Sequence, residues 1–161
     1  MIPRFPEFDT GERIVLFPGT FDPFTIGHKS LVDRALPLFD RIIIAVGEND
    51  SKSSVVPVDD RIDAIARLYG DDPRVEVIAY SGLTVDACRQ HQARWILRGI
   101  RSVTDFEYER AMADVNRRIA GIETVILYSL PELASISSSV VRELEKYDFD
   151  TSEFIPQPES Y

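Results

Sequence analysis

Five short apolar runs, separated by segments with helical patterns, constrain the fold of this chain more than any other feature. The runs lie at 14–17, 42–46, 75–79, 95–97 and 125–128. Each run is almost entirely apolar and is bounded by polar or turn residues, which is typical of strands buried on both faces of a parallel sheet. The helical patterns lie at about 27–39, 59–69, 84–91, 104–120 and 138–147. This alternation predicts an α/β fold with a doubly wound, parallel five-stranded sheet and helices on both faces.

The length of the chain is that of one ordinary domain. Its 161 residues suffice to bury a core, and a composition of 44% apolar and 28% charged residues is that of a globular protein. Residues 1–12 show no periodicity and are predicted to form an N-terminal extension. Residues 13–161 are predicted to form a single domain whose C-terminal tail, after Asp148, is irregular. At the start of the fourth helical segment, Thr104 and Glu107 fit a capping box.

The charge and the cysteine content argue against several classes of protein. A net charge of −9 and a pI near 4.7 oppose a nucleic-acid surface, which needs clustered basic residues, but not a small phosphorylated ligand. The single cysteine, Cys88, excludes an internal disulfide, is expected to be a buried structural thiol, and fits the cytoplasm. Two histidines and one cysteine argue against a His/Cys metal site. No apolar run has the ~20 residues of a membrane span, and no signal peptide is evident.

A turn rich in Gly and Pro follows the first apolar run and leads into the first helical pattern. Its sequence is Gly19-Thr20-Phe21-Asp22-Pro23-Phe24-Thr25-Ile26-Gly27-His28. The backbone N–H groups at a helix N-terminus favour anions, and His28 is expected to add a charge-assisted hydrogen bond to a phosphate. Thr25 and His28 lie three residues apart and therefore share one face of the helix.

Polar residues follow four of the predicted strands, and the carboxyl ends of parallel strands share one edge of the sheet. Thr20 and His28 follow the first strand, and Lys52 lies in the loop after the second. The fourth strand is followed by Arg98-Gly99-Ile100-Arg101, and the fifth by Leu133-Ala134-Ser135-Ile136-Ser137-Ser138-Ser139. Guanidinium groups, hydroxyls and helix N-termini all bind phosphate oxygens, so together these segments predict a polyphosphate site.

Each of these residues also has an ordinary structural explanation. Serine is a favoured N-cap, an arginine forms ion pairs with surface carboxylates, and Glu109 fits a solvated carboxylate on a helix. Three familiar motifs are absent from the sequence: the P-loop, the Gly-x-Gly-x-x-Gly turn of dinucleotide folds and the Gly-x-Ser-x-Gly nucleophile elbow. The predicted phosphate site is therefore of another kind.

The turn at 19–28 resembles the signature of the nucleotidyltransferase superfamily whose motif is (His/Thr)-x-Gly-His. With Lys52, Arg98-Gly-Ile-Arg101, Asp105-Phe-Glu-Tyr-Glu109 and Ile136-Ser-Ser-Ser139, the chain is similar to the bacterial phosphopantetheine adenylyltransferases over about 13–147. The resemblance implies a Rossmann-like fold and transfer of the adenylyl group of ATP to 4′-phosphopantetheine, giving dephospho-coenzyme A and pyrophosphate. The implied mechanism is direct in-line attack with no covalent enzyme intermediate.

The resemblance also implies partners. Mg²⁺ is the implied cofactor, held mainly by the ATP phosphates rather than by protein ligands. A cytoplasmic homohexamer is implied, with coenzyme A as a feedback inhibitor.

Residue roles follow from the same resemblance. His28 is implied to stabilise the transition state, with Lys52 and Arg101 also catalytic. The residues implied to bind 4′-phosphopantetheine are Thr20, Lys52, Thr84 and Arg98. The residues implied to bind ATP are Thr20, Phe21, His28, Gly99, Ile100, Arg101, Glu109, Leu133, Ala134, Ser135, Ile136, Ser137, Ser138 and Ser139.

The chain departs from the family pattern in two places, and two alternatives stay open. Leu133-Ala134-Ser135 stands where many members carry Trp-Ser-Phe, so an adenine contact is expected to differ, and the N-terminal extension is longer than usual. One alternative is another adenylyl- or cytidylyltransferase, acting on nicotinate mononucleotide or a phospho-alcohol, but these usually have a first His where Thr25 stands. The other is a non-catalytic nucleotide-binding regulator, which would be expected to have lost His28 or Lys52.

Overall fold

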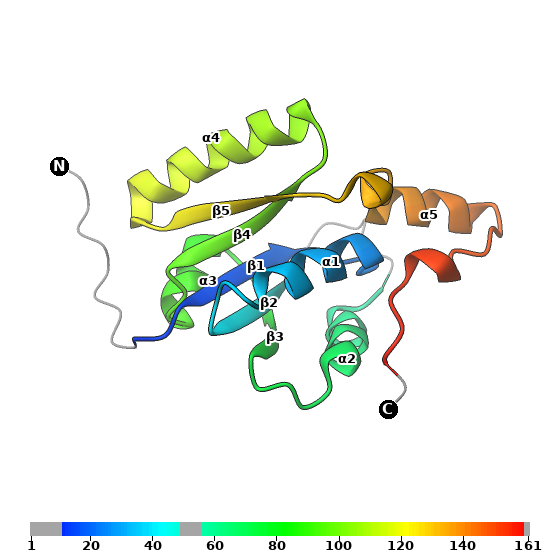
Figure 1. The fold of residues 1–161 in the computed structure, drawn as a ribbon, viewed down its shortest axis with the longest axis horizontal. Coiled ribbons are helices and arrows are strands. Elements are labelled where there is room, and N and C mark those ends of the chain that lie inside the picture. The colour runs from blue at the N-terminus through cyan, green and yellow to red at the C-terminus, as the bar shows by residue number, and fades with distance from the viewer. Residues whose placement is uncertain (1–10, 49–55, 160–161) are drawn as a thin grey trace.

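Strands and helices alternate along the whole described chain (Figure 1). The structure is a computed structural model that describes residues 11–48 and 56–159. The elements are β1 (Ile14–Gly19), α1 (Ile26–Ala35), β2 (Arg41–Gly47), α2 (Val58–Tyr69), β3 (Val75–Tyr80), α3 (Thr84–Gln90), β4 (Trp95–Ile100), α4 (Val103–Ala120), β5 (Glu123–Tyr128) and α5 (Ser138–Lys146). Two short 3-10 helices, η1 (Pro131–Leu133) and η2 (Ser152–Phe154), lie before and after α5. Lys52 and residues 1–10 of the predicted extension lie outside the described residues.

The strands form one parallel sheet in the order β3-β2-β1-β4-β5. The first strand, β1, lies in the centre, and the chain winds from it through β2 to β3 at one edge. It then returns to β4 on the other side of β1 and reaches the opposite edge with β5. This confirms the doubly wound five-stranded fold. The direction of winding reverses between β1 and β4, which is where ligands bind in sheets of this kind.

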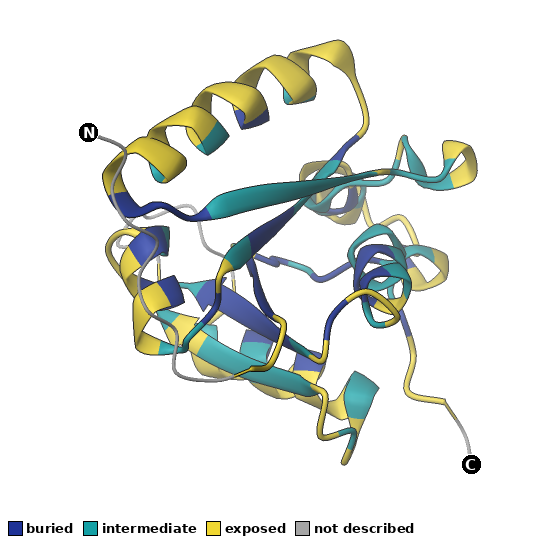
Figure 2. Ribbon diagram, turned by 60° about the vertical axis from the view of Figure 1, so that its left-hand side comes forward, coloured by how far each residue is buried: buried dark blue, intermediate teal, exposed yellow. Residues whose placement is uncertain are grey.

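Two apolar layers hold the helices against the sheet. On one face, Val32 of α1 and Ile65 of α2 pack against alternate residues of β1 and β2. On the other face, Cys88 of α3 and Ala120 of α4 pack against the residues in between. Figure 2 shows the buried strands between helices whose outer sides are exposed. Cys88 is a buried free thiol, as predicted, and burial raises its pKa to about 12.

Two local predictions about helix ends are wrong. The first helix ends at Ala35 rather than near 39, because Pro37 has no backbone N–H to donate to the carbonyl four residues earlier. The fourth helix is capped by Ser102, whose hydroxyl accepts the Asp105 N–H at 3.1 Å, so Thr104 is not the cap. In both cases the neighbouring turn decides where the helix ends.

The fourth strand is longer than predicted, and this changes the position of three candidate residues. Arg98, Gly99 and Ile100 belong to β4 itself, because the strand pairs with β5 as far as Ile100 and Tyr128. Only Arg101 follows the strand.

The two central strands separate at their carboxyl ends. β1 pairs with β4 at only two positions, Val15 with Trp95 and Leu16 with Ile96, although both strands continue beyond them. Past that point Arg98 bridges the gap by donating from Nη1 to the Pro18 carbonyl at 2.8 Å. The separation opens the edge of the sheet at which the predicted site residues lie.

Among the described residues, no helix has the length and apolar character needed to span a membrane.

Candidate active site

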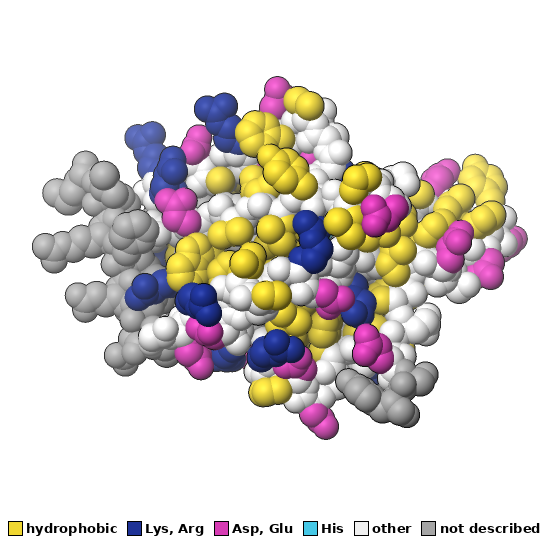
Figure 3. Space-filling view, in the orientation of Figure 1, with side chains coloured by type: hydrophobic (Ala, Val, Ile, Leu, Met, Phe, Trp, Pro, Cys, Tyr) yellow, Lys and Arg dark blue, Asp and Glu magenta, His cyan; other side chains and the backbone are white. Residues whose placement is uncertain are grey.

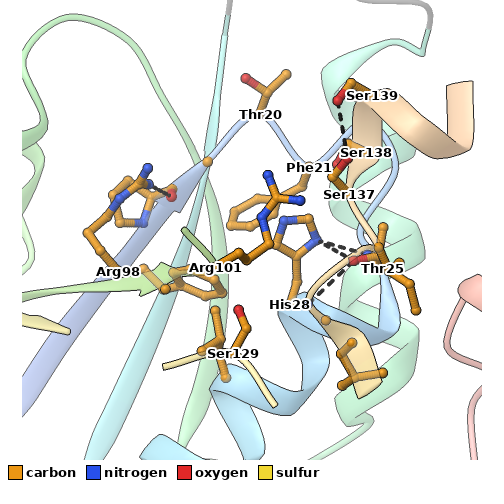
Figure 4. Close-up of a pocket in the computed structure, with 18 of the residues that line it drawn as sticks. Thr20, Phe21, Thr25, His28, Arg98, Arg101, Ser129, Ser137, Ser138 and Ser139 are labelled. Carbon is orange, nitrogen blue, oxygen red and sulfur yellow. Dashed lines mark hydrogen bonds between the residues drawn. The ribbon is translucent and has the colours of Figure 1, made fainter. Parts of the chain in front are cut away.

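A cavity of about 370 Å³ opens where β1 and β4 separate (Figure 4). Its walls come from the β1–α1 turn, the end of β4, the segment after β5 and the start of α5. Of the residues predicted for the site, the wall contains Thr20, Phe21, His28, Arg98, Gly99, Arg101, Leu133, Ile136, Ser137, Ser138 and Ser139. Segments far apart in the sequence therefore meet at one place, as the polyphosphate hypothesis requires.

A second cavity of about 310 Å³ adjoins the first. The two cavities share Pro18, Gly19, Thr20 and Arg98 as a common wall. Thr84 and Glu109, both predicted from the sequence, line the second cavity and not the first. Three predicted residues, Ile100, Ala134 and Ser135, line neither cavity.

His28 is fixed in the first cavity by the residue that caps its own helix. Thr25 is the N-cap of α1, and its backbone N–H donates to His28 Nδ1 at 2.9 Å. The Thr25 hydroxyl lies 3.1 Å from the same nitrogen. Because Nδ1 accepts a backbone N–H, the neutral ring carries its proton on Nε2. That leaves Nε2–H as the ring's donor for a ligand.

Three phenylalanine rings surround the imidazole. Its centroid lies 5.1 Å from Phe21, 5.3 Å from Phe24 and 6.3 Å from Phe17. Burial among these rings, and then the positive charges of Arg98 and Arg101, lower the pKa of His28 to about 4. Near neutral pH the ring of the free protein is therefore uncharged and acts as a neutral donor, so the charge in the expected hydrogen bond would be that of the phosphate.

Phe21 reaches His28 because of an unusual backbone conformation and the absence of a side chain at residue 19. Phe21 has a φ of 51°, in the left-handed region that a bulky residue seldom adopts. Its ring then lies over Gly19, where a Cβ atom would stand 2.7 Å from Phe21 Cζ. A glycine at the end of β1 is thus required by the position of the ring beside the histidine.

Arg98 stands between the two cavities and is already paired. It donates from Nε and Nη2 to the two carboxylate oxygens of Glu109, at 2.9 and 2.7 Å. Glu109 is buried, so this two-point contact holds the guanidinium in one orientation. In the free protein Arg98 therefore forms an ion pair, as its ordinary structural explanation expects. It also lines both cavities, so a ligand in either one would lie next to it.

Arg101 has looser contacts than Arg98. Its Nη1 lies 3.5 Å from the Ala134 carbonyl oxygen, and its Nε lies 3.6 Å from an Asp105 carboxylate oxygen. Figure 4 shows its guanidinium beside the His28 ring. Its positive charge is therefore available at the cavity.

The three serines at the start of α5 have different contacts. Ser137 is the N-cap and accepts the Val140 N–H at 3.2 Å, as its ordinary explanation expects. Ser138 donates to the Pro23 carbonyl at 2.7 Å and so joins α5 to the β1–α1 turn. The Ser139 hydroxyl lies 3.2 Å from that of Ser137. The N–H groups of Ser138 and Ser139, the first two of α5, have no carbonyl acceptor within the helix, and both residues line the cavity.

Two groups of site residues are missing from the sequence prediction. Arg142 lines the first cavity and donates to the Asp22 carbonyl at 2.6 Å. Its signal is its position four residues after Ser138, on the same face of the helix. The second group is Tyr108, Met112 and Asn116, which line the second cavity at intervals of four residues along α4. The signal available in the sequence was the spacing of four residues, with the polar Asn116 on the same helix face as Tyr108 and Met112.

Comparisons with known proteins agree with this geometry. The chain matches the family Cytidylyltransferase-like over residues 16–144. It is 52% identical over 145 residues to the phosphopantetheine adenylyltransferase of Bacteroides thetaiotaomicron, covering 90% of this chain and 96% of that one. It is 49% identical over 146 residues to the phosphopantetheine adenylyltransferase of Porphyromonas gingivalis, covering 91% and 95%.

A solved structure shares the fold. The bifunctional NMN adenylyltransferase/ADP ribose pyrophosphatase from Francisella tularensis superposes with a TM-score of 0.67 at 15% identity. The match covers 92% of this chain and 46% of that chain. At that level of identity the likeness concerns the arrangement of strands and helices alone.

We expect His28 to titrate with a pKa of about 4 in the free protein, below its usual 6.5. NMR of the imidazole nitrogens across a pH series measures this directly, with His28→Gln assigning the signal. Because the unfolded chain takes up the proton first as the pH falls, the contribution of His28 to stability is complete above pH 6.5 and is lost between 6.5 and about 4. A midpoint near 6.5 would contradict the neutral, enclosed ring.

Proposed function

The chain belongs to the phosphopantetheine adenylyltransferases, within the cytidylyltransferase-like nucleotidyltransferases, and on that premise we propose how its two cavities perform the reaction. Its activity is transfer of the adenylyl group of ATP to 4′-phosphopantetheine. We infer that ATP occupies the first cavity and the phosphopantetheine the second. The observation that carries this assignment is the shared wall of Thr20 and Arg98, which would place the two phosphates next to each other.

The first cavity suits a triphosphate. Arg101 and Arg142 bring positive charge to it, and the open N–H groups at the start of α5 favour an anion there. We propose that ATP would enter as its magnesium complex, in which the metal ion would neutralise phosphate charge. In this proposal the ATP phosphates supply most of the ligands of the metal ion; among the described residues there is no group of three or more His, Cys, Asp or Glu that could hold one.

The second cavity suits a long, uncharged arm behind a phosphate. Its far wall, on α4 and β3, offers aromatic and apolar surface from Tyr80, Tyr108 and Met112, together with the amide of Asn116. Pantetheine is a chain of methylene groups interrupted by amides, which matches this mixture. Arg98, on the wall shared with the first cavity, would contact the phosphate of this substrate. We propose that Lys52 also binds that phosphate. Coenzyme A carries the same arm and is proposed to inhibit by occupying this cavity.

Positioning and charge stabilisation suffice for the chemistry. An oxygen of the acceptor phosphate forms a bond to the α-phosphorus of ATP, and the bond to the bridging oxygen breaks, so its electron pair leaves with pyrophosphate. The nucleophile is already an anion at neutral pH, so no general base is needed. His28 would donate from Nε2–H to an α-phosphate oxygen, where charge collects in the transition state.

We expect the purified protein to release pyrophosphate from ATP when 4′-phosphopantetheine is present, and not when nicotinate mononucleotide or a phospho-alcohol replaces it. A coupled pyrophosphate assay with each acceptor in turn measures the difference, and adding EDTA should stop the reaction. Turnover with nicotinate mononucleotide alone would refute the assignment of the second cavity.

The variant His28→Ala should lower kcat at least about a hundredfold, because a donor to the transition state is lost. The variant His28→Gln keeps a neutral N–H donor without the fixed ring, so its kcat should lie between those of His28→Ala and the wild type. Circular dichroism checks that each variant is folded. His91→Ala is the matched control, since His91 caps α3 away from both cavities and should keep the wild-type kcat. Near-normal turnover by His28→Ala would exclude the proposed role.

We propose further that the protein is a cytoplasmic homohexamer. The free, buried Cys88 is consistent with a reducing compartment. Assembly is supported by a stripe of exposed apolar side chains on α4, Tyr108, Met112, Val115 and Ile119, which are 40–63% exposed. Its first two members also line the second cavity, so the stripe continues from the cavity along the helix. Figure 3 shows hydrophobic side chains at the surface along α4, at the top of the view. An exposed stripe of this length is typical of a contact surface.

The double variant Val115→Glu/Ile119→Glu should therefore dissociate the assembly, because it places carboxylates on the apolar stripe without touching a cavity-lining residue. Sedimentation velocity measures the change from hexamer to smaller species. Leu38→Glu, an equally simple change at an exposed leucine after α1, is the control and should leave the hexamer intact. A monomeric wild type, or a double variant that stays hexameric, would overturn the assignment of this surface.

A further inference from the structure

A buried arginine lies behind the wall that the two cavities share, and none of the steps above uses it. Arg61 is in the first turn of α2 and is only 5% exposed. It lies on the apolar side of the helix, one turn before the fully buried Ile65. A charged side chain at a core position needs specific polar partners to be tolerated there.

The partners of Arg61 are carbonyl oxygens from three separate segments. Its Nη1 donates to the Thr20 carbonyl at 2.5 Å and to the Gly47 carbonyl at 3.3 Å. Its Nε donates to the Val56 carbonyl at 3.0 Å. One guanidinium thus connects the turn after β1, the end of β2 and the residue that leads into α2.

Two of these three carbonyls come from residues that line the second cavity. Thr20 and Gly47 both line it, whereas only Thr20 also lines the first. Carbonyl oxygens carry partial negative charge, so unpaired they would oppose a phosphate nearby. Arg61 occupies them and adds a permanent positive charge, because a guanidinium keeps its proton at any physiological pH.

We propose that Arg61 is a positioning residue for the phosphate-bearing acceptor: it fixes the Thr20 turn against the end of β2 and makes the second cavity favourable for a phosphate monoester. The inference rests on the proposed function, since it takes the second cavity as the acceptor site. Arg61 itself touches neither substrate. Its effect reaches the acceptor through the backbone of Thr20 and Gly47 and through its charge.

A structural role alone and a positioning role predict different kinetics. If Arg61 only stabilised the fold, its loss would lower the melting temperature but leave both KM values unchanged for the molecules that remain folded. If it positions the acceptor site, its loss must raise KM for 4′-phosphopantetheine more than KM for ATP. The asymmetry follows because Gly47 lines the second cavity only.

The experiment compares Arg61→Met and Arg61→Lys with the matched control Arg67→Met, an exposed arginine on the same helix. Steady-state kinetics are measured well below each melting temperature. We expect Arg61→Met to raise KM for 4′-phosphopantetheine about tenfold or more while KM for ATP changes less than about threefold, an effect typical of small losses of alignment. Arg61→Lys, which keeps the charge without the planar fork, should recover part of the loss, and Arg67→Met should match the wild type.

A second measurement does not depend on Arg61→Met, because it uses whichever of Arg61→Ala and Arg61→Lys is folded. In Arg61→Ala or Arg61→Lys, added guanidinium at sub-denaturing concentration should lower KM for 4′-phosphopantetheine toward the wild-type value, and the same concentration of sodium chloride should not. An unchanged ratio of the two KM values in folded Arg61→Met or Arg61→Lys would overturn the inference. A wild type that turns over no 4′-phosphopantetheine would instead refute the proposed function, so the two failures are distinct.

Discussion

The early separation of β1 and β4 is the constraint on which the rest of the site depends. The two strands pair at two positions and then diverge, at the place where the winding of the sheet reverses. Beyond that place β1 and β4 no longer pair with each other, and arginine side chains bind carbonyl groups there: Arg98 binds the Pro18 carbonyl, and Arg61 binds the Thr20 carbonyl just after β1. Both cavities lie at this opening, and their common wall is formed by the end of β1 together with Arg98 of β4.

The electrostatics of the site are set locally, against the charge of the whole chain. The protein carries a net charge of −9, yet four arginines gather at the cavity walls or directly behind them: Arg61, Arg98, Arg101 and Arg142. Three of them donate to backbone carbonyls of the β1–α1 region, which spreads positive charge around the turn without acidic partners at those atoms. Burial among the phenylalanine rings, and then this positive environment, lower the pKa of His28 and keep the ring neutral in the free protein.

Much of the fold and a good part of the site were predictable from the sequence. The five apolar runs predict five strands because continuous apolar stretches are stable only where both faces are covered. Thr25 and His28 were expected on one face because three residues span almost one helical turn, and they do contact each other. Arg142 and Arg61 were missed because an arginine on a helix is usually solvated, and local periodicity does not reveal which carbonyl groups it will meet. The site residues that were placed by resemblance alone keep their roles as proposals.

The sequence by itself determined the alternation of strands and helices, the helix-opening turn that holds His28, and the gathering of polar residues at one edge, since all three depend on local pattern and on the direction of parallel strands. Tertiary structure alone decided the rest. Whether Arg98 is free or paired depends on Glu109, eleven residues away, and whether His28 is charged depends on rings that pack around it. Desolvation and ion pairing depend on distances through space between residues remote in the chain, and no local pattern contains those distances.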